Sequence, residues 1–334
     1  MTQEMSAVAP KRKLLIIGSG FIATELAKSA SLRWDWDVEV MYRNYQNPEL
    51  HGLQTHRLPE SIQELMQLIE SVAPTDIVIA LGSSFVPDIN RNLDRALTQH
   101  LNGPLMVLDA VSRLAQPLSG KILMIGSASE YGEFDDVPVD ELHATTPRDH
   151  YGHIKLTLRH LGLYYHQYHS LPVIHIRQFN VTGAAQDKRF VLPSICRQIA
   201  QASLHPSGMT QNIVAGNTAV SRDFLAIDDV CEAYRTLMLS GATGEVYNVC
   251  SGKTYRIDDL ISIAAEVAGV KIKVEVSTQL LRDSDRVQTI ICGDPTKLER
   301  LGWSPKVQMR DLIAQMITKY SPTAESEQAA AEKI

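Results

Sequence analysis

The stretch LLIIGSGFIA, residues 14–23, decides the fold because an apolar run passes directly into glycines and then into a helical pattern. The run at 14–17 predicts a buried strand. Gly18 and Gly20 let the backbone turn tightly and approach a pyrophosphate, whose charge the N-terminus of the next helix stabilises. The small Ala23 lets that helix pack closely on the strand. This order predicts a dinucleotide-binding loop, with a glycine turn that holds no ligand as the alternative.

Further short apolar runs follow, with helical periodicity between them. The predicted strands are residues 38–42, 76–81, 122–125 and 173–176, and the clearest predicted helices are 61–72 and 105–114. Near-continuous apolar strands separated by helices indicate a parallel sheet that is covered on both faces. We therefore predict a doubly wound α/β fold.

The alternation loosens after residue 179. A strand is predicted at 222–227, a helix at 228–239, a strand at 244–249 and a helix at 257–268. Some of these segments are expected to return to the sheet and others to build a smaller lobe. The last residues, 322–334, are rich in Ala and Glu without large apolar side chains, which predicts a flexible tail.

Composition excludes several classes of protein. The chain has 334 residues, of which 44% are hydrophobic and 21% charged, and a formal net charge of -6. No apolar run is long enough to span a bilayer, and the N-terminal MTQEMSAVAPKRK lacks the apolar core of a secretion signal, so we expect a cytoplasmic protein that binds no membrane. Without a Lys/Arg cluster beyond 11–13, no nucleic-acid partner is expected. A soluble enzyme and a small-molecule sensor both remain open.

Neither cysteines nor histidines predict a metal site. The 4 cysteines form no CxxC pair, which disfavours both zinc and a disulfide framework. Pairs such as His150/His153 and His166/His169 have a spacing that would place two ligands on one helix face. No carboxylate or Cys joins them at a suitable spacing, so we expect no metal.

Arg43 helps to choose the cofactor. An acidic residue at the end of the second strand would accept hydrogen bonds from the ribose of NAD, but this chain has Arg43 there. A cation can pair with the 2′-phosphate of NADP. The residue therefore favours NADP(H) over NAD(H), with a merely solvated Arg43 as the alternative.

Two stretches suggest catalysis when they are taken together. IGSASEYG (125–132) follows a strand and contains Ser127, and YGHIK (151–155) begins a helix with Tyr151 and Lys155. Residues four apart lie on one helix face, so the ammonium of Lys155 can approach the phenol and lower its pKa from about 10. Ser127 would then hold a carbonyl oxygen while a nicotinamide delivers hydride. The Tyr-x-x-x-Lys spacing alone occurs often by chance.

The chain resembles the extended short-chain dehydrogenase/reductase family, which acts on nucleotide sugars. Eight stretches recur in the family's order: GSGFIA, TDIVIALG, IGSASEYG, YGHIK, RQFNVTG, SRDFLAIDDV, YNVCSG and GDPTKLERLGW. The resemblance implies a seven-stranded Rossmann core with a smaller C-terminal α/β substrate lobe. It also implies an NADP-binding core at 1–178 plus 212–250 and a nucleotide-sugar lobe at 179–211 plus 251–321.

The resemblance also implies the roles of individual residues. Tyr151 is the expected acid/base, Lys155 binds the nicotinamide ribose, and Ser127 hydrogen-bonds the reacting oxygen. The expected cofactor-binding residues are Gly18, Gly20, Phe21, Ile22, Arg43, Leu81, Gly82 and Lys155, and the expected substrate-binding residues are Ser129, Asn180, Arg222, Arg282 and Asp285. The charged segment LRDSDRV, which contains the last two of these residues, resembles the family's nucleotide clamp, with a solvated loop as the alternative.

Three positions depart from the family pattern. Ile17 and Ala23 stand where the first and last glycines of the phosphate loop are usual, and His100 stands where an Asn is usual. The stretch QTHRLPES offers no clear counterpart of the acidic residue that contacts adenine. These departures concern the cofactor site and leave the three active-site residues in place.

The residues after Ser127 bear on the reaction. A dehydratase of this family needs an acidic residue there, but the chain has Ala128 and Ser129, and Glu130 comes one position too late. The chain is also more similar to the branch with GDP-mannose 4,6-dehydratase and GDP-4-keto-6-deoxymannose reductase than to the UDP-galactose epimerases. We therefore expect NADPH-dependent reduction of a nucleotide-linked 4-keto-6-deoxyhexose, GDP-linked, by a homodimer in deoxysugar biosynthesis. The alternatives are an NAD(P)-dependent epimerase or dehydratase and a non-catalytic NADP-binding sensor.

Overall fold

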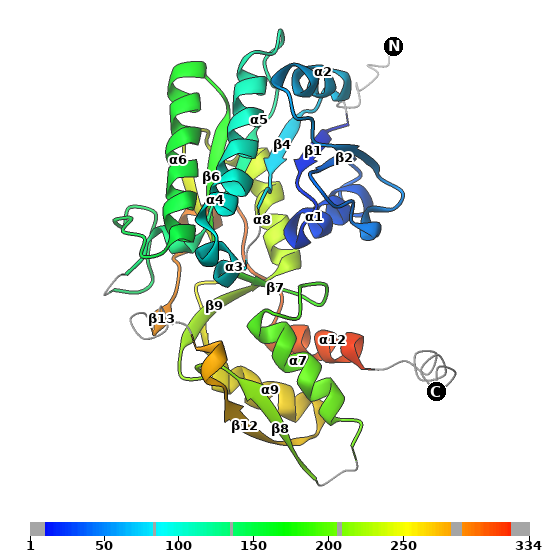
Figure 1. Cartoon of the computed structure of the whole chain (residues 1–334), viewed down its shortest axis with the longest axis vertical. Helices are drawn as coiled ribbons and strands as arrows, with labels where there is room; N and C mark the ends of the chain where they lie inside the picture. Colours follow the sequence, from blue (N-terminus) through cyan, green and yellow to red (C-terminus); the bar gives the residue numbers. More distant parts are fainter. Residues whose placement is uncertain (1–10, 83–84, 134–135, 206–208, 282–288, 322–334) are drawn as a thin grey trace, which may run out of the picture.

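A seven-stranded parallel sheet forms the upper part of the molecule (Figure 1). The computed structural model describes residues 11–82, 85–133, 136–205, 209–281 and 289–321. The strands of this sheet are, in spatial order, β10 (Val246–Val249), β6 (Val173–Gln178), β5 (Ile122–Ile125), β4 (Asp76–Ile79), β1 (Lys13–Ile17), β2 (Asp37–Tyr42) and β3 (Gln54–Arg57). All neighbouring pairs are parallel. The order reverses direction between β1 and β4, which opens a crevice at the carboxyl ends of the strands.

Helices cover both faces of the sheet, and β1 shows why. Leu14 and Ile16 pack into one core cluster with α1 and α8, whereas Leu15 and Ile17 pack into the other with α2, α5 and α6. Successive side chains of a strand point to opposite faces, so an unbroken apolar run is needed when both faces are buried. The bounds are α1 Phe21–Leu32, α2 Ile62–Val72, α5 Gly103–Ser112, α6 His150–His169 and α8 Ile227–Ser240.

Short helical segments lie in the connections between the larger elements. They are η1 Pro48–Leu50, α3 Val86–Arg91, α4 Leu93–Leu97, η2 Thr98–Asn102, η3 Ala128–Glu130 and α11 Thr296–Glu299. The segment η2 is a π-helical turn that runs directly into α5. Because π-turns are rare and are often found at functional sites, η2 is a candidate for a functional role.

A smaller lobe lies below the sheet in Figure 1. Helices α7 (Val191–Ala202), α9 (Ile257–Ala268) and α12 (Met309–Tyr320) enclose its own apolar core. Its strands are β7 Asn180–Thr182, β8 Thr210–Ala215, β9 Ser221–Ala226, β11 Thr254–Arg256, β12 Lys271–Val276 and β13 Ile290–Ile291, and η4 is Thr278–Leu280. The prediction of a doubly wound sheet with a smaller C-terminal lobe is confirmed.

The division of the chain into core and lobe segments stays a prediction, and the strand pairing bears on one boundary. The second core segment was expected to begin at residue 212, but β8 pairs in parallel with β12 and lies outside the central sheet. Likewise β9 pairs with β7, β11 and β13. Sequence alone does not identify the partner of a short strand, because pairing is set by contacts between distant segments.

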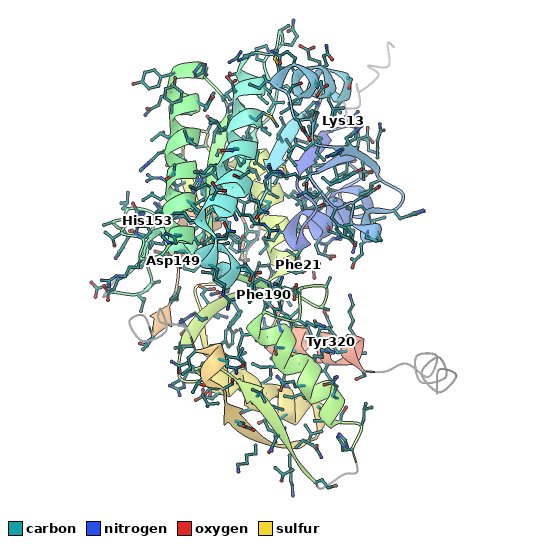
Figure 2. The ribbon with its side chains drawn as sticks, viewed as in Figure 1. Lys13, Phe21, Asp149, His153, Phe190 and Tyr320 are labelled. Atoms are coloured by element: carbon teal, nitrogen blue, oxygen red, sulfur yellow. The ribbon has the colours of Figure 1, made fainter. Side chains whose placement is uncertain are left out.

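Three helix N-termini lie at the level where the core joins the lobe. Figure 2 shows Phe21 of α1, Asp149 before α6 and Phe190 before α7 at this level. The Phe21 ring packs so closely on Gly183 that an added Cβ there would lie 3.1 Å from its Cζ. The carboxyl ends of the central strands face the same region. The crevice at the strand ends therefore opens toward the junction between the core and the lobe.

Candidate functional site

The turn after β1 is shaped for close approach to a ligand. Gly18 has φ 134°, and a Cβ there would lie 2.4 Å from the carbonyl oxygen of Ala80, so only glycine fits. Gly20 is the N-cap of α1 without a side-chain cap, and a Cβ there would meet nothing within 4 Å. The first N–H groups of α1 therefore begin beside open space, where a pyrophosphate fits the helix dipole.

Arg43 lies just beyond β2 and beside this turn. Its Nη1 donates to the carbonyl oxygen of Thr98 in η2, at 3.1 Å. A guanidinium has five N–H donors, so this bond leaves donors for a phosphate. Ser19 Oγ donates to the Tyr45 carbonyl oxygen at 2.8 Å, which holds the segment after Arg43 over the glycine turn. The donor set fits a dinucleotide that carries an extra phosphate.

Ser127, Tyr151 and Lys155 come together at the carboxyl end of β5. Ser127 is the N-cap of η3, and Tyr151 and Lys155 lie one turn apart on α6. Asp149 begins α6 by accepting the N–H of Gly152 at 2.8 Å, which fixes the turn that carries Tyr151. All three residues are buried, at 8%, 8% and 4% exposure.

The pKa of Tyr151 differs from the sequence-based expectation. Lys155 was expected to lower it, but burial raises the pKa of Tyr151 to about 12, against a smaller lowering by its hydrogen bond with Ser127. The Lys155 Nζ lies 5.7 Å from the centre of the Tyr151 ring and donates instead to the carbonyl oxygen of Ile125 at 2.8 Å. The enclosed phenol therefore keeps its proton at neutral pH.

Lys155 itself responds to the same enclosure. Burial lowers its pKa to about 8, and the carboxylate of Glu130 opposes that shift. The side chain is thus mostly an ammonium at pH 7 but close to losing its proton. A protonated phenol, a serine hydroxyl and an ammonium in one enclosed place suit proton donation to an oxygen atom.

Comparisons with known proteins agree with this geometry. The model of the GDP-mannose 4,6-dehydratase family matches residues 24–316. The chain belongs to that family. GDP-6-deoxy-D-mannose reductase of Pseudomonas aeruginosa is 29% identical over 95% of this chain and 99% of its own. GDP-6-deoxy-D-talose 4-dehydrogenase of Aggregatibacter actinomycetemcomitans is 25% identical over 72% of this chain and 76% of its own.

Solved structures show the same fold. The structure of RMD from Pseudomonas aeruginosa, complexed with NADPH, superposes with a TM-score of 0.77 at 27% identity and covers 93% of this chain and 99% of its own. UDP-glucose 4-epimerase of Thermus thermophilus, in complex with NAD, gives a TM-score of 0.79 at 21% identity over 92% and 98% of the two chains. The resemblance to extended short-chain dehydrogenases/reductases is confirmed.

Glu130, which family members with dehydratase activity would need one position earlier, is turned into the protein interior. Its carboxylate is fully buried and accepts the Ser127 N–H at 2.9 Å. It also lies 2.8 Å from His175 Nε2 and accepts from Arg177 Nε at 3.2 Å. Burial raises the pKa of Glu130, but the charges and hydrogen bonds of these partners outweigh it and the net pKa is lowered. A carboxylate held this way supports the turn under Ser127 and is not available to a substrate.

The predicted substrate residues lie on both sides of the junction. Ser129 Oγ accepts from Ser127 Oγ at 3.2 Å, so it borders the active-site serine. Asn180 is on β7, which pairs with the Arg222 strand β9, and its Nδ2 donates to the Asp223 carbonyl oxygen at 3.1 Å. Arg222 Nη1 donates to the carbonyl oxygens of Ser221 and Thr289, at 2.9 and 3.1 Å, so both side chains are held in the lobe sheet. The remaining two predicted residues, Arg282 and Asp285, lie outside the described residues.

His100 was identified from the sequence only as a departure from the family pattern. Its ring is 1% exposed and packs edge-to-face on the Tyr151 ring, with centroids 5.9 Å apart and planes at 80°. A Cβ on Gly82 would lie 2.3 Å from His100 Nδ1, so Gly82, with φ 100°, must be glycine here. No local pattern predicts this contact, because η2 places the ring through a π-turn.

The described residues contain no group of three or more His, Cys, Asp or Glu side chains that could hold a metal ion. The same residues include no helix that is long and apolar enough to cross a membrane. The four cysteines are buried free thiols.

Proposed function

We propose that the protein reduces the keto group of a nucleotide-linked 4-keto-6-deoxyhexose with NADPH, in deoxysugar biosynthesis, and that the nucleotide is GDP. The observation that carries this is the enclosed, protonated Tyr151 hydroxyl beside Ser127, with the nearby carboxylate of Glu130 already occupied by three partners. The similarity to a GDP-6-deoxy-D-mannose reductase, and to the RMD structure that holds NADPH, supports the substrate class and the cofactor.

In this proposal the chain binds the cofactor across the crevice. Gly18 and Gly20 admit the pyrophosphate to the start of α1, and Phe21 and Ile22 follow in its first turn. Arg43 pairs with the 2′-phosphate, which favours NADP(H) over NAD(H). Leu81 and Gly82 line the path at the end of β4, and the bound nicotinamide supplies the hydride.

The proton comes from the protein. Ser127 donates a hydrogen bond to the keto oxygen, and Tyr151 transfers its hydroxyl proton to that oxygen, so the phenol O–H bond breaks as the sugar hydroxyl forms. The pKa of about 12 keeps Tyr151 protonated before the reaction, as reduction requires. Lys155, as an ammonium, stabilises the phenolate that remains and binds the nicotinamide ribose.

The substrate would lie between core and lobe. Ser129, next to Ser127, faces the sugar, and Asn180 and Arg222 hold the diphosphate from the lobe sheet. Arg282 and Asp285 remain assigned to the nucleotide from the sequence alone. Because NADPH and nucleotide sugars are cytoplasmic metabolites, we place the reaction in the cytoplasm.

We also propose a homodimer through α5 and α6. The outer face of α6 exposes Tyr164 and Tyr168, at 48% and 74%, and neighbouring α5 exposes Leu105. Large exposed apolar groups on adjacent helices are typical of an interface. The Tyr164 and Tyr168 rings lie 5.3 Å apart and form one continuous surface.

The proposal is tested by mixing the purified protein with GDP-4-keto-6-deoxymannose and NADPH and following absorbance at the nicotinamide band. We expect stoichiometric oxidation of NADPH, whereas an epimerase would leave its amount unchanged. Tyr151→Phe should lower kcat by about 100-fold or more while NADPH still binds. No turnover with GDP-, dTDP-, CDP- or UDP-linked keto sugars, despite tight NADPH binding, would instead favour a sensor.

A further inference from the structure

His100 is a buried polar side chain without a hydrogen-bond partner. Among the described residues, neither its Nδ1 nor its Nε2 finds one. Leaving a buried polar group unpaired lowers stability, so native proteins keep few such groups, and those that persist often face a ligand or an ordered water. Two unpaired nitrogens on one ring call for a specific explanation.

The ring lies where the proposed cofactor path meets the active site. On one side it contacts Gly82 at the end of the β4 segment, and on the other it packs against the Tyr151 ring. His100, Tyr151 and Lys155 are enclosed to a similar degree, at 1%, 8% and 4% exposure. A ligand that reaches the Tyr151 hydroxyl therefore comes close to the His100 ring, which is packed against the Tyr151 ring.

The ring is neutral in this environment. Burial, helped by the charge of Lys155, lowers the pKa of His100 to about 3. A neutral imidazole offers one donor and one acceptor, which is the pair that a hydroxyl group can satisfy. A positive ring here would instead repel the Lys155 ammonium.

The π-turn that carries His100 is also tied to the other end of the crevice. Arg43 donates to Thr98 at the start of η2, and His100 stands two residues later in the same turn. The turn that holds Arg43 through the Thr98 carbonyl therefore also carries the His100 ring, and a ligand that binds Arg43 lies beside this turn.

We propose that His100 is a cofactor-binding residue whose imidazole hydrogen-bonds a hydroxyl of the nicotinamide ribose, next to Lys155. The inference rests on the proposed function only in requiring that the protein bind NADPH. It adds a contact from η2, at a position where the family usually has Asn, to those expected from Lys155 on α6.

The test uses His100→Leu, which keeps the bulk of the side chain and removes its nitrogens. A buried unpaired polar group is thereby replaced by an apolar one, so the ligand-free variant should melt about 2 to 4 °C higher than wild type. NADPH should bind about tenfold more weakly, because a hydroxyl loses its partner. The two readouts, thermal melting and fluorescence titration of NADPH without substrate, thus move in opposite directions.

Two further variants and one fragment complete the experiment. His100→Asn keeps a donor and an acceptor, so its NADPH affinity should stay within about threefold of wild type. His205→Leu, an exposed position just after α7 in the lobe, is the matched control and should change neither readout. Adenosine 2′,5′-bisphosphate lacks the nicotinamide ribose, so His100→Leu should bind it as wild type does.

The outcomes separate this inference from the proposed function. If wild type fails to bind NADPH, the proposed function is wrong. If wild type binds NADPH and His100→Leu binds it equally well, the ring nitrogens do not contact the cofactor, and the inference is wrong. Loss of stability in His100→Leu, or equal weakening of NADPH and adenosine bisphosphate, would likewise overturn it.

Discussion

At the scale of single residues, burial sets the protonation of the active site. It raises the pKa of Tyr151 to about 12 and lowers those of Lys155 and His100 to about 8 and about 3. In each case the neutral form is favoured, because a charge in an enclosed place loses its hydration. Glu130 keeps its charge since three donors replace the water that it has lost.

Lys155→Met should stabilise the fold and impair catalysis. Because the pKa of Lys155 is about 8 in the fold and near 10.5 when unfolded, the unfolded chain binds more protons between those values, and stability rises with pH across that window. At pH 7 the buried ammonium therefore lowers the free energy of unfolding by about 3 kcal/mol. The variant avoids this cost but loses the hydrogen bond to the Ile125 carbonyl oxygen, which stabilises the fold by about 1 kcal/mol.

The measurement is urea unfolding of both proteins at pH 7 and pH 9. We expect the variant to be about 2 kcal/mol more stable than wild type at pH 7. The difference should be smaller at pH 9, because Lys155 is then mostly neutral in the fold. The other titrating groups are the same in both proteins, so their contributions cancel in the comparison. Reductase turnover should fall by about 100-fold. A variant less stable than wild type at pH 7 would show that the ammonium is better paired than its burial indicates.

At the scale of elements, sequence predicts what local pattern encodes. The strand β1, its glycine turn and α1 were predicted because an apolar run, two glycines and a helical pattern are contiguous. The edge strand β3 reads QTHR and carries no apolar alternation, so nothing local marked it. The π-turn η2 has no sequence signature either, and α5 was expected to begin at 105 but begins at Gly103.

The candidate site divides in the same way. Tyr151 and Lys155 could be predicted because their spacing lies within one helix and because YGHIK is one of the stretches that carry the family resemblance. The function of Glu130 was missed because its partners His175 and Arg177 are on β6, more than 40 residues away. From sequence, Glu130 was only an acid at the wrong position for dehydration. Contacts between distant elements, unlike spacing within a helix, require the fold.

Glu130→Gln should loosen the junction between η3 and β6. The amide can still accept the Ser127 N–H, but it leaves the Arg177 guanidinium buried without its carboxylate. Breaking a buried ion pair on one side costs about 3 kcal/mol or more. Denaturant unfolding at pH 7 should show this loss, together with a lower kcat as Ser127 becomes less well held.

The matched control is Glu266→Gln, which breaks the exposed pair with Arg310. Exposed pairs contribute little, so the change should stay below about 1 kcal/mol. If Glu130→Gln and Glu266→Gln cost the same, the buried carboxylate does not anchor the turn.

At the scale of the whole molecule, core and lobe also contact each other across the crevice. Arg189 before α7 pairs with Asp88 of α3 at 3.0 Å, and its guanidinium lies 4.5 Å from the centre of the Phe85 ring. Phe85 in turn packs edge-to-face on Phe190, with centroids 5.8 Å apart. The formal net charge of -6 does not attract a phosphorylated ligand, so the proposed function assigns the phosphates to individual cations such as Arg43 and Arg222.

The proposed dimer predicts the effect of Tyr168→Glu. A carboxylate on the exposed face of α6, near its C-terminal end, would have to be buried unpaired in the proposed interface, which disfavours association by several kcal/mol. Light scattering after size exclusion should give twice the chain mass for wild type and the mass of one chain for the variant. Leu32→Glu, at the equally exposed end of α1, should stay dimeric. If Tyr168→Glu is still a dimer, the interface lies elsewhere. If wild type is a monomer, the proposed homodimer is wrong. Because α6 also carries Tyr151 and Lys155, turnover of the monomeric variant then measures how far the partner helix holds the catalytic face in place.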